Sequence, residues 1–404
     1  MKLNLLLLTL ALCLIFFVGC GSSRQTPVVN RFTVQPEKKG GDALSTDNPY
    51  FNPDLVVMED REYMPNIRAV KIYRQDVELS MPVLDLAAQD KLMLIFDDLD
   101  GFYKEYRYTI RHCDAYWNPS NLLTSEYIDG FSEGLIQDYA FSQATRQPYV
   151  HYQAFIPTED MKITKSGNYI VLVYLAGDPS QVVLSRRFMI YESRVTVNAR
   201  VKRSAVIEDQ RFKQEIDFEI ERGAYQVDNP YQDLIVIIQQ NGRWDNAIRD
   251  LKPKLVTGSK LSYDWERINV FDGMNEYRHI DLRSLSRLTP RVHMIDRDSV
   301  WNHVYVKPDF KRGFQVYLED KDLNGEYVIS SDEALSNQYT EADYAWVHFT
   351  FPYQSPSDQG AIYLFGALTN WQFLPEAKMV YNATRNTYEA SLYLKQGYYN
   401  YHYV

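Results

Sequence analysis

Residues 91–112, KLMLIFDDLDGFYKEYRYTIRH, contain the pattern that decides the fold class. The runs 91–97 and 105–112 have the composition of β-strands. Between them, DDLDG at 97–101 has the residue types of a tight turn. The stretch therefore predicts two consecutive strands joined by a short turn.

The same succession of short strands and turns continues along the chain. Turn signals include Asn241-Gly242 and Asn324-Gly325, and no long amphipathic helix pattern accompanies them. We therefore predict an all-β protein of consecutive immunoglobulin-like or early-set β-sandwich domains. Further strands are expected at 67–73, 168–175, 181–191, 194–201, 212–220, 234–239, 276–282, 314–318, 346–351, 361–366, 388–394 and 398–404.

The pattern divides into three predicted β domains, at 50–192, 193–306 and 307–404. The first domain contains a long segment, 118–165, with weak periodicity and no clear helix. We expect this segment to be an irregular insert, and long inserts on compact domains are often functional. The last run, 398–404, is expected to be an edge strand, unless the natural chain continues beyond it.

The first twenty residues have the layout of a secretory signal. Lys2 is followed by an apolar run, 3–18, and then by Gly19 and Cys20. The end of this run resembles the bacterial lipobox, in which the cysteine is diacylated and becomes the first residue of the mature chain. We therefore expect a signal peptide at 1–19 and a lipidated tether at 20–49. A plain signal with a chance cysteine, or a spanning helix, is the alternative.

Charge and cysteine content exclude several classes of protein. The formal net charge is −10 and no basic stripe is present, so we expect no nucleic-acid partner. Of the three cysteines, Cys13 lies in the signal and Cys20 would carry lipid, which leaves Cys113 alone in the folded body. No internal disulfide is therefore expected.

Two short motifs suggest chemistry but have simpler explanations. His112 and Cys113 are adjacent, and adjacent side chains of a strand point to opposite faces, so we expect a buried thiol rather than a nucleophile. Residues 320–325, DKDLNG, imitate the start of a calcium loop. A calcium loop needs a bidentate Glu at the position that Ser331 occupies. An Asn-Gly hairpin turn accounts for the same residues. We expect no metal, no cofactor and no catalytic residue.

The segment 361–371, AIYLFGALTNW, looks like the opening of glycogen-binding and early-set β-sandwich modules. In such modules an exposed Trp stacks on a sugar, so Trp371 is a candidate glycan platform. The alternative is a core or corner Trp in a domain that shares only the sandwich.

A series of segments from about residue 50 to the end of the sequence matches one protein family in family order. These segments are LIFDDL at 94–99, 108–120, EYIDGF at 126–131, YVHY at 149–152, KSGNY at 165–169, RRFM at 186–189, QQNGRW at 239–244, NEYR at 275–278, 322–325 and 396–401. Through them the chain resembles the plug protein family of the type IX secretion system of Bacteroidetes. The resemblance implies a non-enzymatic periplasmic protein that binds the periplasmic opening of the outer-membrane translocon barrel and closes it when no cargo is in transit.

The expected location is the periplasmic face of the outer membrane, with the chain anchored through lipid on Cys20. The segment after Cys20, GSSRQ, lacks the acidic run that is typical of surface lipoproteins in these bacteria. The alternative function is that of a polysaccharide-binding outer-membrane lipoprotein that acts through Trp371. A hydrolase that uses Cys113 is a third hypothesis.

Overall fold

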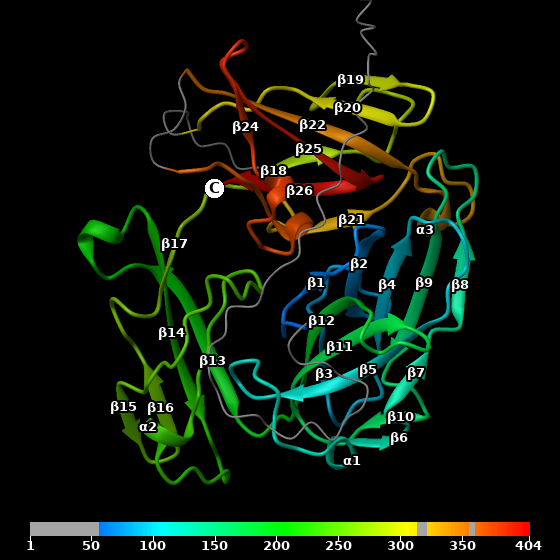
Figure 1. Ribbon diagram of the computed structural model, residues 1–404. Coiled ribbons are helices and arrows are strands. Elements are labelled where there is room, and N and C mark those ends of the chain that lie inside the picture. The colour runs from blue at the N-terminus through cyan, green and yellow to red at the C-terminus, as the bar shows by residue number, and fades with distance from the viewer. Residues whose placement is uncertain (1–55, 313–320, 355–359) are drawn as a thin grey trace, which may run out of the picture. The chain divides into compact units, whose positions relative to one another are not determined.

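The computed structural model describes residues 56–312, 321–354 and 360–404 (Figure 1). All of them belong to one compact unit, Asn48–Val404. The all-β prediction is confirmed, because strands make up 44% of the structure and helices 6%, in several mainly antiparallel sheets. The predicted signal and tether, Cys20 included, lie outside the described residues.

The first part of the chain forms two sheets that share one hydrophobic core. Leu94 and Tyr152 of one sheet and Val171 and Phe188 of the other belong to the same buried cluster. One sheet has the order β1-β12-β11-β5-β7, with β3 beside β12, and the other has the order β2-β4-β9-β8. The bounds are β1 Arg61–Glu62, β2 Ile67–Arg74, β3 Val83–Asp85, β4 Leu92–Asp98, β5 Tyr106–Cys113, β7 Glu133–Leu135, β8 Asp138–Phe141, β9 Val150–Ile156, β11 Gly167–Leu175 and β12 Val182–Tyr191.

The prediction of an irregular insert at 118–165 is wrong. This segment contains β7, β8 and β9, the pair β6 (Ile128–Gly130) and β10 (Met161–Ile163), and the short helix α1 (Thr124–Tyr127). β9 lies between β4 and β8, and most of its side chains are buried. Its Tyr152 is fully buried because its hydroxyl donates to Lys104 O at 3.0 Å and accepts from Lys104 N at 2.8 Å. Tyr-rich sequence therefore forms core here.

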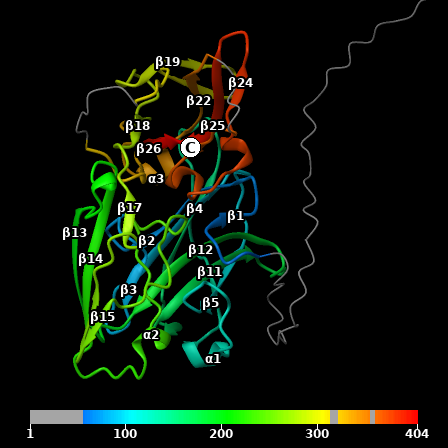
Figure 2. The ribbon, with the colours of Figure 1, turned by 90° about the vertical axis from the view of Figure 1, so that its left-hand side faces the viewer.

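The middle part of the chain forms a separate sheet of order β13-β14-β16-β15, with β17 also paired to β14 (Figure 2). The alternation of Ile216, Phe218 and Ile220 with charged residues gives β14 one apolar face. The predicted strand at 234–239 is wrong, because only Ile238 makes a bridge, to Ile248. The bounds are β13 Thr196–Arg203, β14 Lys213–Glu221, β15 Leu255–Thr257, β16 Lys260–Tyr263 and β17 Val270–Asp272, with helices η1 Ile207–Asp209 and α2 Pro230–Asp233.

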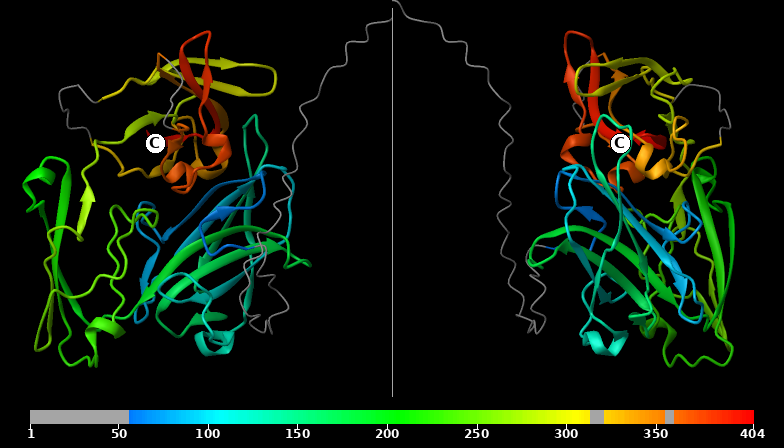
Figure 3. Two further views of the ribbon diagram at one scale, coloured as in Figure 1. Left: turned by 60° about the vertical axis from the view of Figure 1, so that its left-hand side comes forward. Right: turned by 90° about the vertical axis from the view of Figure 1, so that its right-hand side faces the viewer.

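The last part of the chain forms two sheets around a third core (Figure 3). Their orders are β19-β20-β22-β25-β24 and β18-β26-β21, with β23 beside β26. The bounds are β18 Arg278–Asp281, β19 Val292–Arg297, β20 Asn302–Val306, β21 Tyr327–Ile329, β22 Tyr344–Pro352, β23 Leu364–Phe365, β24 Val380–Asn382, β25 Thr387–Lys395 and β26 Gly397–Tyr403, with helices α3 Gln338–Glu341, η2 Ala367–Thr369 and η3 Pro375–Ala377.

Strand pairing in this part differs from two expectations. β18, β19 and β20 lie within the range expected for the second domain, 193–306, yet β18 pairs with β26, and β20 pairs with β22 as well as with β19. The chain therefore passes from the middle sheet to the sheets of the last part between β17 and β18. The final strand is not an edge strand, because β26 pairs with β18 on one side and β21 on the other. Within the described ranges, no helix has the length and apolar composition needed to cross a membrane.

Candidate functional site

A cleft of about 780 Å³ is lined by residues from all three parts of the chain. Its wall carries both charges and aromatic rings. The lining includes Asp60, Lys71, Glu78 and Met81 from the first part, Trp117, Arg186 and Arg187, then Gly242, Trp244 and Arg249, and finally Asp322, Glu326, Asn370 and Trp371.

Arg187 lies against two tryptophans in this wall. Its guanidinium carbon is 4.5 Å from the ring centroid of Trp117 and 6.0 Å from that of Trp244. The two rings meet edge to face, with centroids 5.0 Å apart. Trp117 is buried, and Arg187 Nε donates to Met58 O at 2.7 Å. This contact fixes the segment around Trp244 on the first part of the chain.

Trp371, the candidate glycan platform, is partly buried in the same wall. The guanidinium of Arg243 lies 4.4 Å from its ring centroid, and Asp245 binds that guanidinium at 3.0 and 2.6 Å. The ring also packs against Gly325, where an added Cβ would overlap it. Arg243 therefore occupies a position near the Trp371 ring that a stacked sugar would need.

Side chains from the first part of the chain form hydrogen bonds with backbone groups on the outer edge of β21. Lys71 Nζ donates to Tyr327 O at 2.5 Å and to Glu78 Oε1 at 2.9 Å, while Ile329 N donates to the same Glu78 oxygen at 3.2 Å. Burial lowers the pKa of Lys71, although Glu78 opposes that shift. The ion pair thus takes the place of a neighbouring strand on β21.

A second junction is the fully buried network around Asp97. Lys395 Nζ and the Tyr344 hydroxyl donate to Asp97 Oδ2 at 2.5 and 2.7 Å, and His151 Nδ1 lies 2.7 Å from Oδ1. Burial alone would raise the pKa of Asp97, but Lys395 and His151 hold it below its usual value. Lys395 also donates to Tyr339 O at 2.6 Å. The network joins β4 and β9 to β22 and β25.

This network was not predicted from the sequence. Asp97 was expected where the strand 91–97 meets the turn 97–101, with no buried partner, and Lys395 received no role. The sequence did contain an indication of this buried ion pair, because Lys395 directly follows the largely apolar run ASLYL at 390–394. A charged residue at that place in a core strand needs a buried partner of opposite charge.

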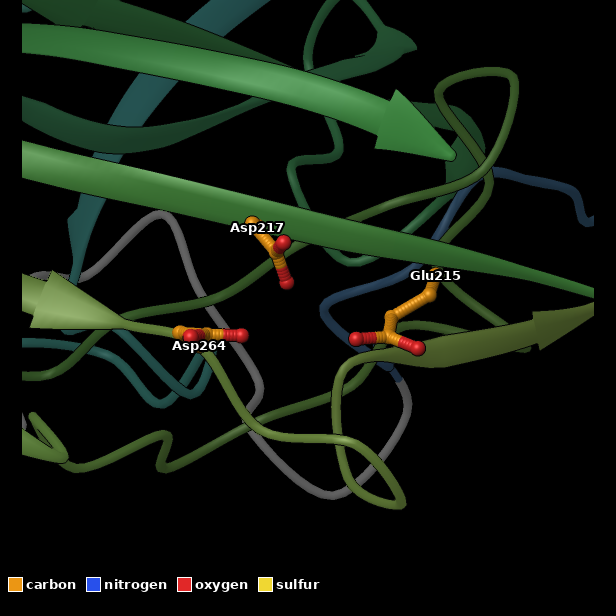
Figure 4. A group of neighbouring side chains, drawn as sticks. All are labelled: Glu215, Asp217 and Asp264. Atoms are coloured by element: carbon orange, nitrogen blue, oxygen red, sulfur yellow. The ribbon is translucent and has the colours of Figure 1, made fainter. Parts of the chain in front are cut away.

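One acidic group among the described residues has the spacing of a metal site. Glu215 and Asp217 extend from β14, and Asp264 follows β16 (Figure 4). Lys202 Nζ lies 3.1 Å from Glu215 Oε1, 2.5 Å from Asp217 Oδ2 and 3.9 Å from Asp264 Oδ1. Hydrogen bonding to Asp217 raises the pKa of Lys202. The chain therefore supplies its own cation to these carboxylates.

His112 and Cys113 lie on opposite faces of β5, as predicted. The His112 ring packs against Tyr127 and Tyr169 of the first core, whereas Cys113 belongs to a separate cluster with Trp117. Burial raises the pKa of the Cys113 thiol to about 12. The thiol is therefore protonated and unsuited to nucleophilic attack.

Asn324 and Gly325 form a tight turn in the calcium-like segment, although in the described part of the chain no pair of strands flanks it as a hairpin. Asn324 and Gly325 both have positive φ, at 53° and 89°. The Asp322 carboxylate accepts from Tyr277 N at 2.6 Å and from Asn324 N at 2.9 Å. The carboxylate therefore organises the backbone of the turn.

Four polar side chains that sequence spacing did not connect form a chain across β20, β22 and β25 and the turn that precedes β20. Ser391 Oγ lies 2.7 Å from His348 Nδ1, and His348 Nε2 lies 3.0 Å from His303 Nδ1. His303 Nε2 lies 3.0 Å from Asp298 Oδ2. Burial and the neighbouring His303 lower the pKa of His348. These histidines are distant in sequence, so only strand pairing brings them together.

Comparison with known proteins relates the chain to a protein family and to a solved structure. Residues 67–192 match the family described as type 9 secretion system plug protein, first domain. The chain is also similar to a hypothetical protein from Parabacteroides merdae ATCC 43184, known from a crystal structure at 2.30 Å resolution. The TM-score is 0.83 at 31% identity, over 86% of this chain and 87% of that one. No curated protein matches the chain.

Proposed function

Because the chain belongs to the type 9 secretion system plug protein family, we propose that it binds the periplasmic opening of the outer-membrane translocon barrel of that system. There it closes the barrel when no cargo is in transit. The family is a component of secretion and not an enzyme family. The match of residues 67–192 to the plug family carries the proposal.

The internal junctions support a role that depends on a rigid body. A wide barrel leaks solutes unless its open end is occluded, and a closing body must resist deformation. The Asp97–Lys395 network and the Lys71–Glu78 pair join the first part of the chain to the last through buried, hydrogen-bonded charges. The Arg187 stack joins the first part to the middle. Such contacts suit occlusion by docking, which requires no bond chemistry.

The proposal includes a location in the cell envelope. A lipid on Cys20 would hold the protein at the periplasmic face of the outer membrane, with residues 20–49 as tether. We also propose domains at 50–192, 193 to about 275, and about 276–404. The last boundary follows the change of strand pairing between β17 and β18.

Binding is tested by mild-detergent purification of the tagged, full-length protein from its native membranes, followed by mass spectrometry. Recovery of a very large outer-membrane barrel in stoichiometric amount is expected. Recovery of the protein alone, or with components of glycan uptake, would contradict the proposal. A tagged, unrelated outer-membrane lipoprotein from the same cells is the matched control.

A further inference from the structure

β13 is an eight-residue strand with a neighbour on one side. It pairs along its whole length with β14, from Thr196 opposite Glu221 to Arg203 opposite Gln214. In the part of the chain that the structure describes, no strand pairs with its other side (Figure 2). In an antiparallel pair every second residue points its N–H and C=O away from the neighbour. β13 therefore has a row of unpaired backbone groups.

The strand is also uncovered on its apolar face. Directly opposite residues of two antiparallel strands share a face. Val197, Ala199 and Val201 therefore continue the apolar row of β14, since they lie opposite Ile220, Phe218 and Ile216. The β14 row packs in a separate hydrophobic cluster with Leu234, Val236 and Ile238. By contrast, Val197 is 55% exposed and Val201 is 64% exposed.

The turn between β13 and β14 also exposes large apolar side chains. Ile207 is 81% exposed and Phe212 is 66% exposed. Seven of the eight residues of β13 are exposed as well. A long exposed edge strand with apolar side chains pairs readily with another chain unless charge or a covering segment prevents it. We call the surface of Val197, Ala199, Arg200, Val201, Ile207 and Phe212 the β13 edge.

Charge on the β13 edge indicates what can pair with it. The strand carries Arg200, Lys202 and Arg203 and no acidic residue. Lys202 is held by acidic side chains, whereas Arg200 and Arg203 have no ion pair among the described residues. A second copy that paired antiparallel with this edge would bring the same basic residues together, which is unfavourable. An acidic strand would instead find opposite charge.

We propose that the β13 edge binds an extended segment of a partner protein in which apolar residues alternate with acidic residues. The segment adds to the sheet as a further strand and satisfies the free N–H and C=O groups of β13. Its apolar side chains cover Val197 and Val201, and its carboxylates lie beside Arg200. That the partner is the secretion translocon rests on the proposed function. The addition of a strand to β13 does not depend on that function.

The test is site-specific photo-crosslinking in native cells. A benzophenone amino acid replaces Ala199 in the full-length protein, and the crosslinked peptide is identified by mass spectrometry. The matched control places the same group at Val380, which is 69% exposed on the edge strand β24. We expect the yield of crosslinked product with the group at 199 to exceed the yield with the group at 380 by at least about tenfold. The double variant Val197→Lys, Val201→Lys and the variant Arg200→Glu should each lower it to the control level.

The outcomes separate this proposal from the proposed function. An alternating apolar and acidic peptide from the translocon supports both. Such a peptide from another protein supports strand addition and contradicts the translocon as the partner. A yield at 199 no higher than at 380 overturns strand addition, even when the translocon still co-purifies with the parent chain. A yield that the Lys and Glu variants leave unchanged, or a crosslinked peptide without acidic residues, also overturns it. Circular dichroism confirms that the variants fold.

Discussion

The ammonium nitrogen of Lys395 lies 2.5 Å from Oδ2 of Asp97, and both side chains are buried. The two residues are 298 positions apart, at the ends of β25 and β4. Two buried charges are tolerated only when each has good partners, and here Tyr344, His151 and Tyr339 O complete the set. The first and last parts of the chain are therefore coupled through this buried polar centre, in addition to the Lys71–Glu78 pair.

Removal of one charge from this centre should destabilise the folded protein strongly. Lys395→Met leaves the Asp97 carboxylate buried without its cation, and we expect a loss of about 3–5 kcal/mol in the free energy of unfolding. Urea unfolding measures it. Adding Asp97→Asn should recover part of the loss, because Asn can still accept from Tyr344. Lys378→Met, at an exposed lysine, should change stability by less than about 0.5 kcal/mol. Equal effects of Lys395→Met and Lys378→Met would refute the coupling.

The packing of Trp371 is tested through a pair of glycines with nearly equal φ. Gly325 has φ 89° and lies against Trp371, whereas Gly177 has φ 88° and open space around its Cα. Gly177→Ala should cost only the left-handed backbone strain, about 1–2 kcal/mol. Gly325→Ala should cost about 1–3 kcal/mol more, because the new methyl group overlaps the indole. Similar denaturation midpoints for the two variants would show that Trp371 does not pack as described.

His402 should make stability depend on pH. Burial, with a smaller contribution from Arg243, lowers its pKa to about 4, compared with about 6.5 in the unfolded chain. Between these values the unfolded chain binds more protons, so stability falls as the pH is lowered from about 6.5 toward 4. His402→Phe, whose ring suits a site beside Phe365 and Tyr277, should reduce this slope. Parallel stability curves for parent and variant would contradict the expectation.

The proposed membrane anchor depends on the sulfur atom of Cys20. If Cys20 carries lipid, Cys20→Ser should move the protein from the membrane fraction to the soluble fraction of the periplasm. Cys113→Ser should leave the distribution unchanged, since that thiol is buried in the fold. Membrane fractionation with immunoblotting measures both. Retention of the Cys20→Ser protein in a strain without the translocon would contradict lipid anchoring.

The sequence predicted the fold class and many of the strands correctly. The strands expected at 168–175 and 181–191 correspond to β11 and β12, which pair antiparallel. The turns at Asn241-Gly242 and Asn324-Gly325 were also predictable, since Asn and Gly tolerate the positive φ found there. The separation of His112 from Cys113 followed from the twofold period of a strand.

Other features depend on contacts between distant segments, which local pattern does not contain. β9 was missed because its Tyr and His residues look polar until their hydroxyl and ring groups find buried partners. The run 234–239 looks like a strand because it is almost continuously apolar, yet only Leu234, Val236 and Ile238 pack against the β14 core, and the run does not pair with that sheet. The position of Trp371 was set by Arg243, from another part of the chain.

The most direct test of the plug function is the permeability of the outer membrane. Uptake of a large hydrophilic antibiotic or dye is compared in three strains: the parent, a strain without this protein, and a strain without both this protein and the translocon barrel. Closure of the barrel predicts uptake that rises in the single deletion and returns to the parental level in the double deletion. Unchanged uptake in the single deletion, with the barrel present in the membrane, would contradict the account.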